Sequence, residues 1–289
     1  MKPLRLRKET KEVKITIIVF TLLYIAYAII NLFPIYWSII NTFKTAEEFF
    51  ANNLSLPKSL YFDNYARVFT DFRTRQYTYV DMLYNSVWIV FMSVFCNVAA
   101  SAMLAYPVAK YRFPGKEVIY ALVIFVNTIP IIGGGAAGYK LLLALGMIDN
   151  PSTIWFSWFC GFDFAFIVFY GTFKGIDKTY SEAAKIDGAN NVTIFLKIIL
   201  PQAVPSIAAI AITQAIGVWN NYSISMISLR SYPTLAYGLY IFDQESYYVE
   251  NSKPLYFSAA IVSCLPVVIL YGANQKLILE NVTAGGLKG

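Results

Sequence analysis

Long apolar runs alternate with short polar segments along the whole chain. A hydrocarbon core about 30 Å thick requires roughly 20 apolar residues in a helix. Six runs reach that length, at about 15–40, 84–107, 118–139, 152–173, 203–228 and 255–275. Lipid offers the backbone no hydrogen-bond partner, and no strand-like alternation persists over these lengths. The pattern therefore predicts an all-α, polytopic membrane protein with six transmembrane helices in a single domain over residues 1–289.

The distribution of lysine and arginine predicts the orientation of the spans. Fifteen of the 23 basic residues lie in the N-terminal segment, the second and fourth connections and the C-terminal segment. Because cytoplasmic loops carry an excess of basic residues, both termini and residues 174–202 are expected to be cytoplasmic. The first apolar run continues beyond the cleavage-like Ala26-Tyr27-Ala28, so we expect it to remain as an uncleaved anchor.

Composition excludes several classes of function. The chain is 57% hydrophobic and 14% charged, with a mean hydropathy of +0.54, which is too apolar for a soluble domain. It has no histidine, and its three cysteines share no ligand spacing, so we predict neither a metal site nor a catalytic centre. The net charge of +6 is not gathered on a soluble face, so a nucleic-acid partner is not expected.

A compact polar segment at 182–201 separates the fourth and fifth runs. Ser181 is a candidate N-cap, and Glu182 in the first turn complements the helix dipole. Ala183 leaves one side thin, so that a partner surface could approach closely. Gly188 permits a turn that other residues resist, and Pro201 ends the pattern.

The same segment resembles the EAA loop of ABC-importer permeases. The residues that carry the resemblance are Glu182, Ala183, Ala184, Asp187, Gly188, Ile198, Leu200 and Pro201. The resemblance implies a short helical elbow that docks on a separate cytoplasmic ATPase subunit and relays its closure to the membrane helices. Those residues are therefore candidates for coupling to the ATPase, within a coupling loop expected at 174–202.

A wider resemblance to maltose-type, carbohydrate-importing permeases covers nearly the whole chain. It is carried by Phe62–Tyr65, residues 105–116, Trp219–Tyr222 and the tail at 283–289. Within the tail, Ala284, Gly285, Gly286 and Lys288 are candidate contacts at the ATPase interface, although Gly286 and Leu287 replace two usual members.

The resemblance implies a multi-pass subunit of a prokaryotic cytoplasmic membrane, surrounded by lipid. Its implied partners are a second homologous permease, two ATPase subunits, an extracytoplasmic solute-binding protein and a sugar. The chain itself is expected to hold no cofactor, because ATP and Mg would be bound by the ATPase.

Polar and aromatic residues inside the apolar runs are candidates for a substrate path. An intramembrane carboxylate such as Asp163 is costly, so it either lines a wet pathway or accepts hydrogen bonds from neighbouring groups. Other polar groups could bind sugar hydroxyls and aromatic rings could stack on sugars, or all could be ordinary contacts between helices. The further candidates are Asn127, Tyr170, Gln214, Trp219, Asn220, Asn221 and Tyr222.

A glycine run at 133–138 superficially resembles a phosphate-binding loop. Gly133 and Gly138 have the required spacing, but Tyr139 follows and Lys140 comes one position late. We therefore reject nucleotide binding there. Close helix packing and lining of the transport path remain equal alternatives.

The leading interpretation is a permease subunit of an ATP-driven carbohydrate importer, with an oligosaccharide as the expected cargo. The alternatives are a permease for a non-sugar solute, and an ATP-independent channel or secondary transporter. Ion coupling usually needs several charges along the spans, whereas Asp163 stands alone there. An intramembrane enzyme would need clustered acid–base or metal-binding residues, and none is present in the sequence.

Overall fold

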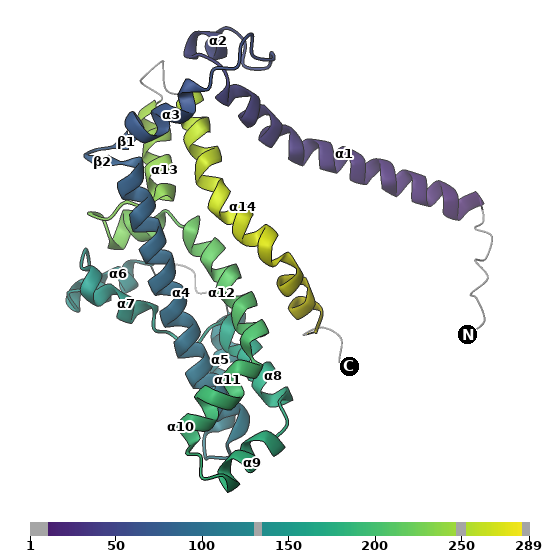
Figure 1. Ribbon diagram of the computed structural model, residues 1–289, viewed down its shortest axis with the longest axis vertical. Helices are drawn as coiled ribbons and strands as arrows, with labels where there is room; N and C mark the ends of the chain where they lie inside the picture. Colours follow the sequence, from purple (N-terminus) through teal and green to yellow (C-terminus); the bar gives the residue numbers. More distant parts are fainter. Residues whose placement is uncertain (1–10, 130–134, 247–252, 285–289) are drawn as a thin grey trace. The chain divides into compact units, whose positions relative to one another are not determined.

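The computed structural model describes residues 11–129, 135–246 and 253–284, and these are mostly helical (Figure 1). The elements in chain order are α1 (Lys11–Thr42), α2 (Ala46–Ala51), α3 (Asp63–Thr70), β1 (Arg73–Thr74), β2 (Tyr77–Thr78), α4 (Tyr79–Lys110), α5 (Lys116–Thr128), α6 (Gly135–Ala144), α7 (Pro151–Trp158), α8 (Phe164–Gly175), α9 (Thr179–Ile186), α10 (Asn191–Ile194), the π-helix η1 (Phe195–Ile199), α11 (Leu200–Gln202), α12 (Val204–Trp219), the π-helix η2 (Ile224–Ser228), α13 (Leu235–Ser246) and α14 (Lys253–Ala284).

The chain divides into two compact units. One unit comprises Met1–Val68 with Glu245–Val262, and the other comprises Phe69–Gln244 with Ser263–Gly289. The second unit contains the polar segment that the sequence singles out.

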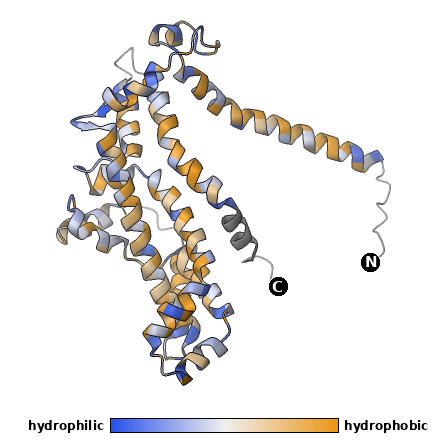
Figure 2. Cartoon of the chain, viewed as in Figure 1, coloured by the Kyte–Doolittle hydropathy of each residue, from blue (hydrophilic) through white to orange (hydrophobic). Residues whose placement is uncertain are grey.

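In the first unit, α1 is apolar along most of its length (Figure 2), and none of its most apolar stretch is buried. The chain beyond α1 is held by side-chain amides. Asn64 on α3 donates hydrogen bonds to the carbonyls of Thr42 and Lys44, each at 2.8 Å. Lys44 is fully buried, and its ammonium donates to the carbonyl of Asn52 at 3.0 Å. Burial lowers the pKa of Lys44.

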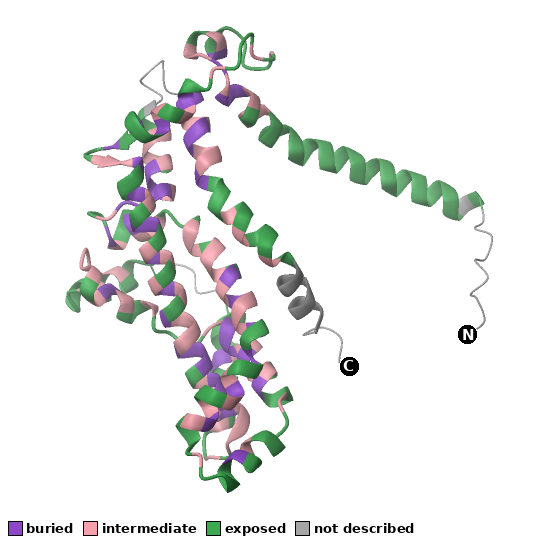
Figure 3. Cartoon of the chain, viewed as in Figure 1, coloured by how far each residue is buried: buried purple, intermediate pink, exposed green. Residues whose placement is uncertain are grey.

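In the second unit, α4 packs against α7, α8 and α12. Aromatic residues on one face of α8 form the centre of its core, since Phe166, Phe169 and Phe173 are all fully buried. They pack in one cluster with Ala105 and Tyr106 of α4. Figure 3 shows buried positions along α4 and α8. The polar segment packs against this cluster, which also includes Ala184, Ile194 and Ile199.

Among the described residues, three helices are long and apolar enough to cross a membrane, and a fourth span results if one bent pair counts as a single span. The long helices are Val13–Thr42, Tyr79–Lys110 and Lys253–Gln275, and the bent pair is Asn191–Gln202 with Val204–Trp219. The six-span arrangement therefore stays a prediction.

Three of the predicted spans are not continuous helices, since the run at 203–228 also breaks between α12 and η2. The run at 118–139 ends its first helix at Thr128, and Ile129 is extended because a residue that precedes proline avoids the helical region. The run at 152–173 is interrupted at 159–163. There Gly161 lies against α4, where an added Cβ would come within 3.1 Å of the Ala100 carbonyl oxygen.

The structure also contains one element that the all-α prediction lacks. Strands β1 and β2 form a short antiparallel hairpin, in which Arg73 pairs with Thr78 and Thr74 with Tyr77. Thr78 then caps α4, because its hydroxyl accepts from the Asp81 amide at 3.3 Å.

Candidate functional site

We refer to residues 177–202 as the coupling segment, and its first helix, α9, begins earlier than predicted. The Asp177 carboxylate accepts hydrogen bonds from the Thr179 amide at 2.9 Å and the Thr179 hydroxyl at 2.7 Å. The bond from the Thr179 amide, and to a smaller extent the bond from its hydroxyl, lowers the pKa of Asp177. The predicted N-cap at Ser181 is wrong: its hydroxyl is buried and has no hydrogen-bond partner in the described part of the chain.

The predicted glycine turn at the end of α9 is confirmed. Gly188 has a φ of +81°, in the left-handed region that favours glycine. The Ala189 amide donates to the Ala184 carbonyl at 2.9 Å, and the Gly188 amide donates to the Lys185 carbonyl at 3.0 Å. This pair of bonds is a Schellman motif, which satisfies the last carbonyls of a helix.

The two sides of α9 differ in character. Ala184 faces the core and is 7% exposed, whereas Glu182 and Ala183 are exposed. At the end of the helix, Ile186 is 87% exposed, and Asp187 beside it is also exposed. The exposed side of α9 thus combines one large apolar side chain with small and charged residues.

The second half of the coupling segment is anchored in the core. Phe195 in η1 lies 4.6 Å from the ring of Tyr106 and meets Phe173 edge-on at 6.2 Å. Ile194 and Ile199 are each at most 1% exposed. A displacement of this half would therefore also act on α4 and α8, which it contacts.

Pro201 accounts for the widened turn before α12. Without an N–H group, proline cannot donate to the carbonyl four residues earlier, that of Lys197. The preceding residues form a π-helix instead, in which the Leu200 amide donates to the Phe195 carbonyl. The helix axis then bends by 74° before Val204. Of the predicted coupling residues in this half, Ile198 and Leu200 are half-buried and Pro201 is exposed.

Two predicted substrate-path residues, Asp163 and Gln214, belong to one polar network. Asp163 precedes α8, and one of its oxygens accepts from the Ser101 hydroxyl at 2.8 Å and the Phe166 amide at 3.2 Å. Its other oxygen accepts from the side-chain amide of Asn97 at 2.6 Å. The amide oxygen of Asn97 in turn accepts from Gln214 on α12. Of the two roles considered for Asp163, the structure shows the hydrogen-bonded one.

Asn127 and Tyr170 do not join this network. The side-chain amide of Asn127 donates to the Val123 carbonyl one turn earlier in α5 at 2.8 Å. The ring of Tyr170 lies 4.6 Å from that of Tyr120, with the ammonium of Lys174 over it at 5.5 Å.

The remaining candidates lie at the end of α12. The Trp219 indole donates to the Ser263 carbonyl at 3.1 Å. Asn220 and Asn221 are exposed, and their side chains bond to nearby backbone groups. Tyr222 stacks on Tyr240 with ring centroids 4.7 Å apart and planes inclined by 8°. The structure does not bring all the substrate-path candidates into one cavity, so that assignment stays a prediction.

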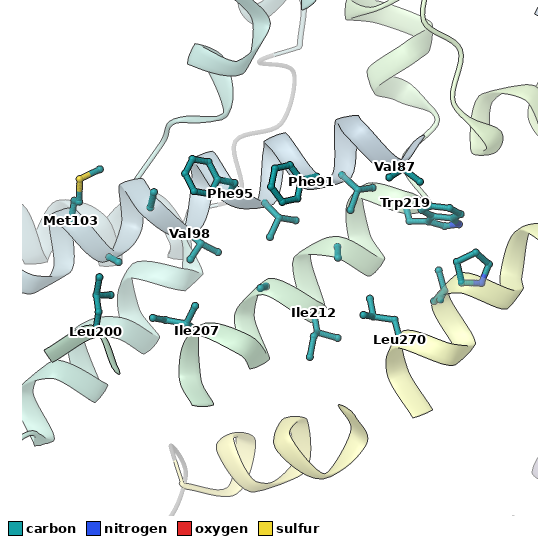
Figure 4. Close-up of a pocket in the computed structure, with 18 of the residues that line it drawn as sticks. Val87, Phe91, Phe95, Val98, Met103, Leu200, Ile207, Ile212, Trp219 and Leu270 are labelled. Atoms are coloured by element: carbon teal, nitrogen blue, oxygen red, sulfur yellow. The ribbon is translucent and has the colours of Figure 1, made fainter. Parts of the chain in front are cut away.

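A large apolar cavity of about 870 Å³ opens along α4, α12 and α14 (Figure 4). Trp219 lines it, together with Phe91 and Phe95 of α4. These two phenylalanines are 67% and 61% exposed, and their rings stack at 6.3 Å. The cavity offers no charged group among its lining residues, so it is suited to an apolar occupant.

Two sequence features fall largely outside the described residues. Ala284 is the last residue of α14, while Gly285, Gly286 and Lys288 of the tail lie beyond the described part. Gly133 and Gly134 are also outside it, but Gly135 and Gly138 lie in α6, where an added Cβ would meet nothing within 4 Å. Close packing of these two glycines within the described chain is therefore not observed.

A coupling segment with an exposed first helix and a buried second half, joined to long apolar helices, is typical of a membrane transport component. Residues 97–282 match the family described as "Binding-protein-dependent transport system inner membrane component". The chain belongs to this family.

Individual relatives agree with this placement. The chain is 28% identical to the diacetylchitobiose uptake system permease protein NgcG of Streptomyces coelicolor, over 91% of this chain and 86% of that protein. It is 31% identical to the maltose/maltodextrin transport system permease protein MalG of Vibrio vulnificus, over 72% of each chain. Its fold is similar to a chain of a bacterial ABC transporter involved in alginate import, with a TM-score of 0.79, 24% identity, and coverage of 93% of this chain and 99% of that one.

Asn97 and Ser101, the two α4 residues of the polar network, are not among the residues predicted from the sequence. Their spacing of four residues places them on one face of the helix. Polar residues at that spacing inside an apolar run were the available signal, because such residues usually have partners on neighbouring helices.

Proposed function

We propose that the chain is one permease subunit of an ATP-driven importer for a carbohydrate, an oligosaccharide, in a prokaryotic cytoplasmic membrane. The names of the relatives, which include permeases for diacetylchitobiose and maltodextrin, support this cargo class. The observation that carries the proposal is the coupling segment, whose first helix is exposed and whose second half is packed into the core.

In the proposed arrangement, the chain crosses the membrane six times and both termini are cytoplasmic. The excess of basic residues around residues 174–202 supports a cytoplasmic coupling segment. The helix end at Thr128 and the interruption at 159–163 would then lie within the third and fourth spans. Backbone breaks at that depth require cover from protein or a wet cavity, and Gly161 lies directly against α4.

A separate ATPase subunit would bind the exposed face of α9. Ile186 would insert into an apolar pocket of that subunit, and the small Ala183 would allow a close approach. ATP and Mg would be bound by the ATPase. Closure of two ATPase subunits would press on the coupling segment, and contacts between Phe195 and Tyr106 would transmit the displacement to α4.

The apolar cavity supports a second, homologous permease as a further partner. Its lining residues from α4, α12 and α14 are apolar, and the exposed Phe91 and Phe95 would be covered by a helix of that subunit. An extracytoplasmic solute-binding protein would deliver the sugar on the opposite side of the membrane. Exposed aromatic and amide groups such as Tyr222 and Asn220 are the proposed contacts for that sugar.

Affinity purification of the chain with its candidate ATPase tests the proposal. Ile186→Asp should abolish co-purification of the ATPase and sugar uptake, because it places a charge in an apolar contact. The matched control is Leu60→Asp, since Leu60 is 62% exposed but lies outside the coupling segment. Retention of the ATPase and of uptake in Ile186→Asp would refute the proposed contact. Sugar uptake that is not inhibited by competing oligosaccharides would refute an oligosaccharide as the cargo.

A further inference from the structure

Asn97 is the central residue of the polar network, because both ends of its side-chain amide are used. The NH₂ group donates to Asp163 at 2.6 Å and to the Cys160 carbonyl at 3.2 Å. The amide oxygen accepts from Gln214. We infer that Asn97 is a positioning residue, and that its bond to Gln214 is a latch that holds α12 against α4 in one state of the transport cycle.

The chemistry of the neighbours fixes the orientation of this amide. A carboxylate can only accept hydrogen bonds, and the NH₂ group of Gln214 can only donate. If Asn97 rotated by half a turn, its oxygen would face Asp163 and its NH₂ group would face the NH₂ group of Gln214. Ser101 and the Phe166 amide hold the carboxylate from the other side. The amide therefore presents a fixed acceptor to α12.

The position of the latch connects it to coupling, and this step rests on the proposed function. Helix α12 follows the coupling segment directly, so a push on the segment acts on α12. A second bond joins α8 to the start of α12, from the Thr172 hydroxyl to that of Ser206 at 2.9 Å. Gln214 lies eight residues further on, or about 12 Å along the helix. When Gln214 is released, α12 retains the contact at Ser206 and can tilt about it.

Release of the latch is expected to populate the other state of the transport cycle even when no binding protein is present. Loss of one hydrogen bond from a charge-assisted network commonly changes an equilibrium constant about tenfold. ATP hydrolysis by the assembled transporter in the absence of binding protein should therefore rise about tenfold when the network is broken. The amount of sugar moved per ATP should fall.

The experiment uses the complete transporter in liposomes. Gln214→Leu removes the donor on α12, and Ser101→Ala removes a donor to Asp163. Each has a matched control in which a hydroxyl outside the network is lost. Thr213→Ala is adjacent to Gln214, and Ser93→Ala makes the same change on α4 at a buried hydroxyl without a partner in the described chain. Both test variants should raise basal hydrolysis, and both controls should match wild type.

A double variant tests the bond itself. Asn97→Ala combined with Gln214→Leu should be no worse than Asn97→Ala alone, because the two act through one bond.

Basal hydrolysis at the control level in Gln214→Leu and Ser101→Ala would overturn the latch, as would additive effects in the double variant. If Gln214→Leu fails to assemble, the Ser101 and Ser93 pair decides. Wild-type transporter that shows no stimulation by its binding protein would instead refute the proposed function, and the latch with it.

Discussion

Replacement of Gly188 tests whether the shape of the α9 turn matters for coupling. The positive φ of +81° costs other L-residues about 1–2 kcal/mol, because their Cβ then crowds the backbone. An added Cβ at this position meets nothing within 4 Å, so no steric clash adds to that cost. The turn should therefore be depopulated by about 5-fold to 30-fold in Gly188→Ala.

The series of variants at this position has a predicted order. Gly188→Asn should be milder than Gly188→Ala, because asparagine tolerates the left-handed region, and Gly188→Val should be the most severe. Gly175→Ala is the matched control: its Cβ would also meet nothing within 4 Å, and its φ is not in the left-handed region. It should behave as wild type.

The assay is ATP hydrolysis by the purified transporter, stimulated by sugar-loaded binding protein, with the ATPase content of each sample measured. Coupled hydrolysis should fall in the order Gly, Asn, Ala and Val at position 188. Wild-type coupling in Gly188→Val, or an equal loss in Gly175→Ala, would refute the argument that backbone geometry at this turn positions the contact surface.

Three further predictions concern individual side-chain contacts. Asp177→Ala should lower the melting temperature at pH 7 by removing the cap of Thr179. Because the pKa of Asp177 is lowered, the stabilisation is fully present above about pH 4 and is lost as pH falls through the lowered pKa. The difference in melting temperature from wild type should therefore shrink in acid. A difference that stays constant with pH would contradict this. Asn64→Ala should destabilise the protein by about 1–3 kcal/mol in denaturation measurements, because two carbonyls lose their donor, and an unchanged midpoint would contradict it. Phe195→Leu should weaken contact with Tyr106 by about 1 kcal/mol and reduce sugar moved per ATP while the ATPase still co-purifies; loss of the ATPase would show that Phe195 belongs to the docking surface instead.

Local chemistry explains which parts of the coupling segment were predictable. The Gly188 turn follows from a property of glycine itself. The N-cap was mispredicted because α9 begins before Ser181: Lys178 is the N-cap, and Asp177 accepts from the amide and hydroxyl of Thr179. Ser181 lies inside α9, where a hydroxyl cannot cap. Sequence alone does not rank such candidate helix starts.

Long-range partners could not be read from the sequence. The isolated charge at Asp163 indicated a special environment, but its neighbours on α4 lie more than sixty residues earlier in the chain. Which helices meet depends on how their small and aromatic residues pack. The closeness of Gly161 to α4, where an added Cβ would lie 3.1 Å from the Ala100 carbonyl oxygen, is likewise a long-range contact.

Accessibility of residue 186 tests the central claim most directly. In a chain whose native Cys96, Cys160 and Cys264 are replaced, Ile186→Cys and Leu60→Cys each provide a single exposed thiol. A membrane-impermeant maleimide should label Leu60→Cys in intact cells. It should label Ile186→Cys only in inverted vesicles, and only when the ATPase is absent. Labelling of Ile186→Cys from outside the cell, or labelling that the assembled ATPase does not block, would contradict the account.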